Sequence, residues 1–332
     1  MFDLFCHPAY RRPSLLDQCG LRFILLVSLL GFAPALMAEL TLDETPAEIR
    51  VSLGGKPVLT YVKKERPVPE GISEDYRRSG YIHPVYSPGG KEVTDDFPAD
   101  HAHQHALFFA WTNTMFDGKK VDFWNLAKKT GTVEFRGVES ILRKDDRVGF
   151  TVNHAFVAIA EGRRTDVLKE TWTVTVHKTA GDYFSFDIVS VQECASEKPL
   201  VLSKYRYGGM AFRGHIDWLG KDSGFQFVTS EGNNRLEGNH TRPNWVAMSG
   251  LIGGEQTSIA VMCSPKNFRA PQSVRMHPSK PYFCFAPMVT DSFRIEPGAQ
   301  YVSRYRYLVH SAAVDPKVVE KHWRQYRSAS DL

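Results

Sequence analysis

The chain has 332 residues, of which 42% are hydrophobic, 12% aromatic and 23% charged, and this composition is that of a folded protein. Lysine and arginine (41) nearly balance aspartate and glutamate (37), without long runs of like charge, which argues against the electrostatic footprint of a nucleic-acid-binding protein. We therefore expect no nucleic-acid partner.

Residues 1–38 are predicted to be a signal peptide. Arginines ending at Arg22 precede an apolar run over 23–33, and small residues follow at Ala35 and Ala38. This is the order of a secretory signal, and the run is shorter than the roughly 20 residues that a membrane-spanning helix needs. We expect an exported protein, periplasmic or secreted, without stable membrane insertion after the signal is removed.

Three cysteines remain after the predicted signal, Cys194, Cys263 and Cys284. An odd number at wide spacing predicts neither a disulfide framework nor a zinc site, and allows one disulfide at most. Cys263 and Cys284 lie in apolar, strand-like runs, where a thiol behaves as a small buried hydrophobe.

Residues 39–332 are predicted to form a single all-β domain. Glu48 to Val62 alternates on both sides of Gly54-Gly55, which is a hairpin signal. The same period of two returns in eight further segments: 132–142, 148–160, 167–177, 183–191, 225–228, 258–263, 282–285 and 301–309. Because helices do not alternate with these strands, the pattern favours a large antiparallel β-sandwich.

A short helix is predicted near the C-terminus. Asp315 can cap it, Pro316 fits the first helical position, and Val318, Val319 and Trp323 give it one apolar face. We expect this helix to pack on the sandwich.

The densest polar cluster of the chain runs from Asp100 to His105 and leads directly into the apolar segment 107–111. If the whole stretch is one strand, His101, His103 and His105 point the same way as alternate apolar side chains. Imidazoles directed into a partly buried pocket suit proton transfer or hydrogen bonds to sugar hydroxyls. The alternative is a solvated histidine-rich loop before a later strand.

A divalent metal is a further alternative for this cluster, held by His101, His103 and His105. Zinc and iron sites usually add a carboxylate or another histidine from elsewhere in the chain. The candidates for that additional ligand are Asp100, His83 and Glu170.

Glu170 is predicted to be a catalytic acid or base. It shares one face of its strand with Leu168 and Trp172, and a carboxylate on an apolar face is costly unless it is paired. We expect His101 or His103 to lie within about 8 Å of its carboxylate in a shared pocket, a gap that one water or sugar hydroxyl can bridge. The alternatives are a solvated strand end or a structural pair with an arginine.

Arginine and tryptophan side chains suggest a carbohydrate pocket. Arg206 lies in the segment 205–209, and Trp124, Trp218 and Trp245 could supply stacking rings beside its charged donors. The alternative is that the tryptophans serve only in packing.

Several of these motifs resemble the signature of the exported bacterial proteins of the PmoA-like family, which have a DH-x-H-H core followed by a FWAW-like strand. The matching segments are Tyr81–Gly90, Thr94–His105, Phe109–Trp111, Asp122–Trp124, Tyr207–Arg213 and Glu296–Tyr307. Gln104 stands where that pattern has a second histidine and Ala106 where it has glycine, which leaves His101 and His103 as the residues carried over.

The resemblance implies a secreted β-sandwich of undetermined activity, from bacteria that digest polysaccharides. It does not imply a membrane methane oxygenase subunit, because residues 39–332 contain no apolar run of about 18 residues. The closing segment and the segment Tyr207–Arg213 are also faintly similar to the galactose-mutarotase-like sandwich proteins, which act on sugars with histidine and acidic residues.

The sequence therefore predicts an exported carbohydrate-active protein in which His101 or His103 and Glu170 exchange protons with a sugar, as an isomerase, lyase or hydrolase. The predicted substrate-binding residues are His83, Asp100, His105, Asp122, Trp124 and Arg206. The alternatives are a metal-dependent enzyme that uses the histidine cluster and a non-catalytic carbohydrate-binding module.

Overall fold

The computed structural model describes residues 38–328. Apart from Ala38, the predicted signal peptide lies outside the described residues. Within the described range, no helix is long and apolar enough to cross a membrane.

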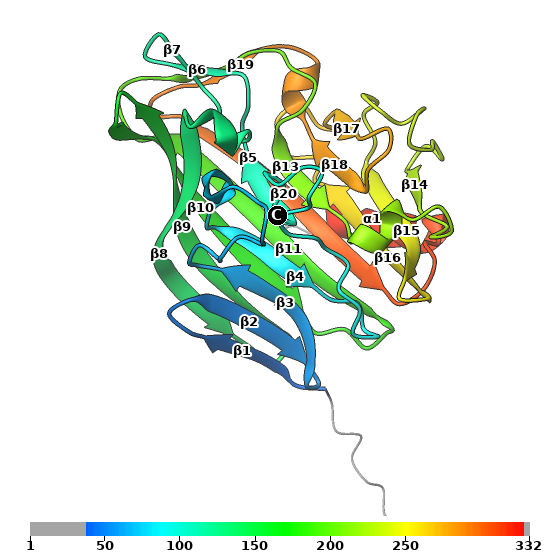
Figure 1. The fold of residues 1–332 in the computed structure, drawn as a ribbon. Coiled ribbons are helices and arrows are strands. Elements are labelled where there is room, and N and C mark those ends of the chain that lie inside the picture. The colour runs from blue at the N-terminus through cyan, green and yellow to red at the C-terminus, as the bar shows by residue number, and fades with distance from the viewer. Residues whose placement is uncertain (1–37, 329–332) are drawn as a thin grey trace, which may run out of the picture. The chain divides into compact units, whose positions relative to one another are not determined.

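Two antiparallel eight-stranded sheets are layered face to face, with β1–β4 in front of β8–β11 in Figure 1. Sheet 1 has the order β1 (Leu40–Glu44), β2 (Glu48–Leu53), β3 (Lys56–Val62), β4 (Tyr81–Val85), β5 (Leu107–Ala110), β13 (Gly209–Arg213), β18 (Tyr282–Phe285) and β17 (Val274–Met276). Sheet 2 has the order β14 (Gln226–Thr229), β15 (Trp245–Ile252), β16 (Glu255–Cys263), β20 (Gln300–His310), β11 (Tyr183–Cys194), β10 (Arg163–His177), β9 (Arg147–Ala160) and β8 (Gly131–Arg143). The predicted β-sandwich is therefore confirmed.

A third, four-stranded sheet lies at the top of Figure 1. Its order is β19 (Phe293–Ile295), β12 (Leu200–Leu202), β6 (Thr114–Phe116) and β7 (Lys119–Val121). Short 3₁₀ helices η1 (Glu74–Tyr76), η2 (Leu126–Lys128), η3 (Ile216–Leu219) and η4 (Pro287–Val289) interrupt the connections. The sequence pattern did not predict the three-residue strands, because so short a segment shows no clear periodicity.

The two faces of sheet 1 pack against different surroundings. Phe109 and Phe283 belong to the main core between sheets 1 and 2, whereas Phe108 and Tyr282, their neighbours in the chain, belong to a second buried cluster with Trp124. Because successive side chains of a strand point to opposite faces, this second cluster lies on the outer face of sheet 1. The sandwich thus offers two places for buried side chains, one on each side of this sheet.

The predicted C-terminal helix is confirmed as α1 (Pro316–Ser328). The Asp315 carboxylate accepts a hydrogen bond from the Lys317 amide at 2.8 Å, as an N-cap does. Val319, Trp323 and Tyr326 are buried against β15, β16 and β20. The helix therefore covers the outer face of sheet 2.

The cysteines behave as small apolar side chains in the described residues. Cys194, Cys263 and Cys284 are all free thiols, and the last two are buried. Burial raises the pKa of Cys263 and of Cys284 to about 11, so both stay protonated at neutral pH.

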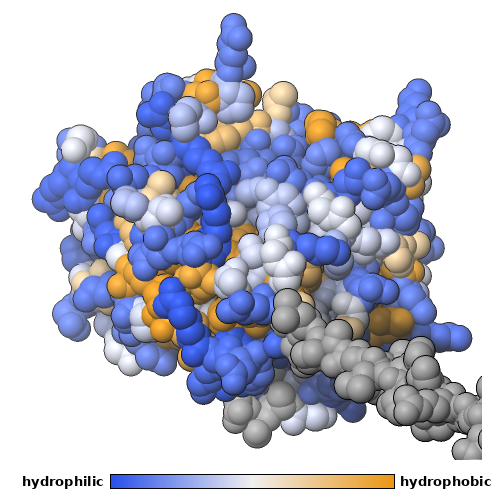
Figure 2. Space-filling view, turned by 90° about the horizontal axis from the view of Figure 1, so that it is seen from below, coloured by the Kyte–Doolittle hydropathy of each residue, from blue (hydrophilic) through white to orange (hydrophobic). Residues whose placement is uncertain are grey.

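The surface is mainly polar. In the face shown in Figure 2, hydrophilic side chains predominate and apolar ones are interspersed among them. The large hydrophobic side chains exposed in residues 38–328 are Ile216, Leu236 and Phe268.

Candidate functional site

The histidine cluster lies in a loop and not in a strand. The loop makes two successive turns, in which the His101 amide donates to the Pro98 carbonyl and the Gln104 amide donates to the His101 carbonyl, each at 2.9 Å. Ala106 has a φ of 55°, which breaks the alternation before β5 begins at Leu107. The prediction of one continuous strand was therefore wrong. The loop alternative is correct, but the loop is not solvated, because His101 and His103 are half-buried and His105 is buried.

Arg213, at the end of β13, anchors this loop from inside. Its buried guanidinium donates to the Gln104 amide oxygen at 3.0 Å and to the Asp100 carboxylate at 2.9 Å, while Lys280 reaches the other Asp100 oxygen at 2.8 Å. Burial acts to raise the pKa of Asp100, but Lys280 and Arg213 outweigh it and hold that pKa well below its usual value. Asp100 is an ionised anchor of the loop.

The loop forms one wall of a cavity of about 350 Å³ on the outer face of sheet 1. Its lining residues are His101, His103, Gln104, Trp124, Asn125, Arg206, Tyr207, Arg275, His277 and Tyr282. The lining contains three imidazoles, two guanidinium groups, two amides and three aromatic rings, but no carboxylate.

The His101 imidazole contacts the other two imidazoles of the cavity edge to face. The ring centre of His101 lies 5.7 Å from that of His103 and 5.3 Å from that of His277. Burial lowers the pKa of His103 and of His277 to about 4, so both rings are neutral at pH 7. A neutral imidazole has one nitrogen that can accept a proton or a hydrogen bond.

Aromatic side chains form the apolar part of the cavity. The Trp124 ring centre lies 5.2 Å from that of Tyr207 and 5.9 Å from that of Tyr282. The Tyr282 hydroxyl lies beside the Cys284 thiol and has no nitrogen or oxygen partner in the described chain. Burial raises the pKa of Tyr207 to about 12, so its phenol remains a proton donor.

Asp122 supports this aromatic wall without lining the cavity. Its carboxylate accepts hydrogen bonds from the backbone amides of Trp124 and Asn125 at 3.1 and 2.9 Å, and from the Lys128 ammonium at 2.7 Å. Burial acts to raise the pKa of Asp122, and these donors outweigh it and lower that pKa. Asp122 therefore fixes the turn that carries Trp124 and Asn125.

Two glycines allow Arg206 and Tyr207 to reach the cavity. Gly208 and Gly209 have φ values of 134° and 113°, which side chains disfavour. A Cβ atom on Gly209 would lie 2.3 Å from the Phe285 carbonyl oxygen of β18. The chain can therefore pass this close to β18 only because no side chain is present.

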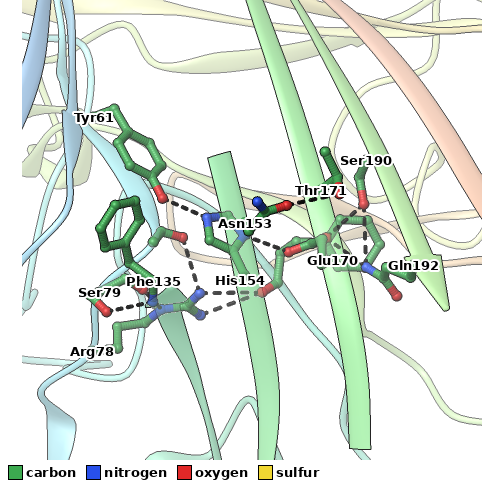
Figure 3. Close-up of polar contacts among 12 residues, drawn as sticks. Tyr61, Arg78, Ser79, Phe135, Asn153, His154, Glu170, Thr171, Ser190 and Gln192 are labelled. Atoms are coloured by element: carbon green, nitrogen blue, oxygen red, sulfur yellow. Dashed lines mark hydrogen bonds and ion pairs between the residues drawn. The ribbon is translucent and has the colours of Figure 1, made fainter. Parts of the chain in front are cut away.

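Glu170 lies elsewhere, in a sealed network between the sheets (Figure 3). Its carboxylate contacts His154 Nδ1 at 2.8 Å and accepts hydrogen bonds from Ser190 Oγ at 2.6 Å and Gln192 Nε2 at 2.8 Å. The Tyr61 hydroxyl contacts the other nitrogen of His154 at 2.5 Å. Only 1% of the Glu170 surface is exposed, so the prediction that it lies on the apolar face of its strand is confirmed.

The expected meeting of Glu170 with the loop histidines does not occur. Glu170 is not among the cavity-lining residues, and neither His101 nor His103 hydrogen-bonds to it. The physical reason is that β10 turns this side chain into the core between the sheets, whereas the cavity lies on the outer face of sheet 1. The prediction of one shared pocket was wrong.

A buried arginine completes the sealed network. The Arg78 guanidinium donates to the backbone carbonyls of Ser79, Gly80 and Phe109 at 3.3–3.5 Å (Figure 3). Burial lowers the pKa of Arg78 to about 10, while the charge of Glu170 acts in the opposite direction. Arg78 therefore remains a cation in the interior, near the Glu170 anion.

His105 and His83 do not line the cavity either. His105 is fully buried with its Nδ1 2.9 Å from the Asp96 carboxylate, which also accepts the Tyr81 hydroxyl at 2.8 Å. His83 Nδ1 lies 3.0 Å from the Thr94 hydroxyl, and burial lowers the pKa of His83 to about 4. Both histidines bond to residues of the same connection between β4 and β5.

Of the residues predicted to bind substrate, Trp124 and Arg206 line the cavity. The other two tryptophans serve in packing. Trp218 stacks on Phe225 with ring centres 5.3 Å apart, and Trp245 donates to the Glu320 carboxylate of α1 at 3.0 Å.

The predicted metal set of His101, His103 and His105 is not formed, because His105 faces Asp96. Across residues 38–328, no three histidine, cysteine, aspartate or glutamate side chains are placed to share a metal ion.

Sequence reasoning missed several residues of the cavity. His277 follows β17 and Arg275 lies on it, and both are isolated in the sequence from the histidine cluster. Tyr207 and Asn125 could have been found from the sequence, because each directly follows a residue that was predicted to bind substrate, Arg206 or Trp124. The fold brings these residues from three separate segments to the histidine loop.

The chain matches the model of one protein family over residues 48–324, described as a family of unknown function (DUF6807). This match covers most of the chain, which therefore belongs to that family. Curated proteins gave no sequence match. The resemblance to PmoA-like proteins stays a prediction.

The structure is also similar to distant solved structures. A heparan sulfate lyase, HepC, from Pedobacter heparinus is 8% identical with a TM-score of 0.38, over 81% of this chain and 34% of the other. An α-N-acetylgalactosaminidase, NagBb, from Bifidobacterium bifidum is 13% identical with a TM-score of 0.34, over 86% and 37%. This chain thus spans about a third of the length of these two proteins.

A GalM/aldose epimerase homologue from C. elegans is 9% identical with a TM-score of 0.33, over 84% of this chain and 100% of the other. TM-scores this low carry no argument about the chemistry of the cavity, which has to come from its own residues.

Proposed function

We propose that this member of the DUF6807 family binds a carbohydrate in the cavity between the histidine loop and the outer face of sheet 1, and transfers protons on it. The observation that carries the proposal is the set of three imidazoles, His101, His103 and His277, gathered beside an aromatic wall in one cavity.

The cavity has the mixed chemistry that a sugar ring needs. A pyranose ring has apolar C–H faces, which stack on aromatic rings, and hydroxyl groups, which hydrogen-bond to planar polar side chains. Trp124, Tyr207 and Tyr282 supply the rings, while Gln104 and Asn125 supply amide donors and acceptors. Its volume of about 350 Å³ is within the range of small-molecule sites.

The imidazoles supply the proton chemistry. His103 and His277 have pKa values of about 4, so each is in the basic form at neutral pH and can accept a proton from a bound hydroxyl or carbon. Tyr207 is held protonated and can donate one. Glu170, sealed between the sheets, takes no part in this proposal.

The test is a panel of polysaccharides and oligosaccharides incubated with the protein purified without a histidine tag. New reducing ends report hydrolysis, ultraviolet absorbance of an unsaturated sugar reports elimination, and NMR of the anomeric protons reports isomerisation. We expect turnover in one of these assays, lost in His103→Gln and kept in His322→Gln, since His322 lies on α1 and does not line the cavity. Turnover that survives His103→Gln unchanged would count against the proposal.

A second candidate, a carbohydrate-binding module without catalysis, is favoured by one observation. No carboxylate lines the cavity, so the paired acids of a typical glycoside hydrolase are absent from its wall. Binding that needs Trp124 and His103, with no turnover across the panel, would select this candidate over the enzyme.

The proposal includes export to the periplasm or the outside of the cell, on the basis of the predicted signal peptide at 1–38. Sequencing the N-terminus of the protein made in a bacterial host tests it. We expect mature protein that starts near Glu39, and recovery of the intact first 38 residues would contradict export.

A further inference from the structure

We infer that the sugar taken by this cavity is acidic, and that Arg206 and Arg275 bind its carboxylate or sulfate group. The inference rests on the proposed function, since it names the class of sugar that would occupy the same cavity.

The charge of the lining is the first reason. Two guanidinium groups line the cavity and no carboxylate does. Asp100, the acidic residue that holds the histidine loop, is already neutralised by its ion pairs with Arg213 and Lys280. Guanidinium groups without a carboxylate partner attract an anion, and this attraction is stronger in a concave site than on an open surface.

Arg206 is held in place without an ion pair. It is exposed, and its guanidinium lies over the rings of Tyr205 and Tyr207, 5.9 and 5.8 Å from their centres. No carboxylate in the described chain lies within ion-pair distance of it. These cation–π contacts with two rings orient the guanidinium but leave its hydrogen-bond donors free for a ligand.

Arg275 presents a second cation from β17. It is half-buried, and one guanidinium nitrogen donates to the Asn239 side-chain oxygen at 3.1 Å. Within residues 38–328 it has no carboxylate partner. Holding one nitrogen of a guanidinium on a neutral amide fixes the group without cancelling its charge.

Neutral imidazoles make the same wall compatible with an anion. His103 and His277 are uncharged at neutral pH. The pKa of His277 is lowered mainly by burial, then by the neighbouring His101, and then by the positive charge of Arg275. The arginines therefore provide the positive charge of the cavity, and the histidines stay free for hydrogen bonds or proton transfer.

The test is calorimetric titration of the full protein with three trisaccharides: one of galacturonate, one of sulfated galactose, and neutral galactotriose. We expect at least one of the two charged sugars to bind about 10-fold or more tightly than the neutral one, the scale of one charge-assisted hydrogen bond. The better of the two charged sugars identifies the anion as carboxylate or sulfate. Its affinity should also fall as salt is added.

The variants Arg206→Gln and Arg275→Gln should each weaken the charged sugar by about 10-fold and the neutral one by much less, because only the charged sugar loses an ionic partner. Arg163→Gln is the matched control. Arg163 is also exposed and has no ion pair with any residue of 38–328, but it begins β10, away from the cavity lining. It should change neither affinity.

The outcomes separate the inference from the proposed function. If neutral and charged sugars bind equally and the two arginine variants have no effect, the acidic-sugar inference fails while a sugar site in the cavity stands. If no sugar binds and none shifts the NMR signals of His101, His103 or His277, both fail.

Discussion

The sealed network around His154 and the cavity cluster of three histidines lie on opposite faces of sheet 1, and they differ in how their polar atoms are paired. In the sealed network, His154 uses both ring nitrogens, one on Tyr61 and one on Glu170. In the cavity, no hydrogen bond ties His103 to a described residue, and His101 Nδ1 has no hydrogen-bond partner although it lies 3.4 Å from Asp100.

The contrast shows how a structural polar group differs from one available to a ligand. Buried polar atoms that the protein itself pairs contribute to fold specificity and stability. Polar atoms that line a cavity and lack a protein partner can pair with a ligand instead. The following predictions test this division, from the largest expected effect to the smallest.

Removing the carboxylate of the sealed network should have the largest effect. Glu170→Ala leaves His154, Ser190 and Gln192 buried without their acceptor, and breaking such a network costs about 3–5 kcal/mol. Urea unfolding measures the loss. Glu170→Gln, which keeps the shape, should cost less; if it is instead fully stable but abolishes turnover, Glu170 is catalytic and the division fails.

Replacing a cavity histidine should reduce turnover strongly and stability only slightly. His103→Gln should reduce turnover about 100-fold, the scale of a lost acid or base, and change the free energy of unfolding by less than about 1 kcal/mol. Kinetics and urea unfolding on one preparation give both numbers. A large loss of stability would place His103 with the structural groups.

The cavity should also make stability depend on pH. The pKa values of His103 and His277 fall from about 6.5 in the unfolded chain to about 4 in the folded one. The unfolded state therefore binds more protons between pH 6.5 and pH 4, so stability is complete above 6.5 and declines as the pH falls through this window.

The variant His103→Gln/His277→Gln should flatten that decline, as measured by urea unfolding at a series of pH values. His83 titrates in the same window and stays in both proteins, so the difference between them reports the cavity. An identical decline in both would show that the cavity histidines keep ordinary pKa values.

A matched pair of tyrosines gives the smallest effect. Tyr61→Phe removes one buried hydrogen bond to His154 and should cost about 1 kcal/mol of stability without changing sugar binding. Tyr207→Phe removes a hydroxyl that bonds to Asn125 at the cavity and should weaken sugar binding with little change in stability. The opposite pattern would reverse the assignment of the two clusters.

Sequence alternation alone predicted about half of the strands in the described residues, including the five longest, β8 to β11 and β20. The period-two segments 132–142, 148–160 and 282–285 coincide with β8, β9 and β18, and Asp315 and Pro316 begin α1. These features depend on neighbours in the chain, so alternation and capping residues are enough to predict them.

The sequence also selected four residues that line the cavity, His101, His103, Trp124 and Arg206, but it did not determine which of the polar groups meet. Glu170 is a charged residue at an apolar position of its strand, and in the sequence a catalytic acid looks the same. Only the layering of sheets 1 and 2 shows that its carboxylate faces His154.

The tertiary structure alone decided the membership of the cavity. His277 joins His101 because β17 and β18 pair beside β13, whose Arg213 anchors the histidine loop. Strand order depends on pairings between segments far apart in the chain, and these pairings cannot be predicted from the local periodicity of each segment. The sequence thus determined the long alternating strands, and the order of all the strands decided which side chains form the site.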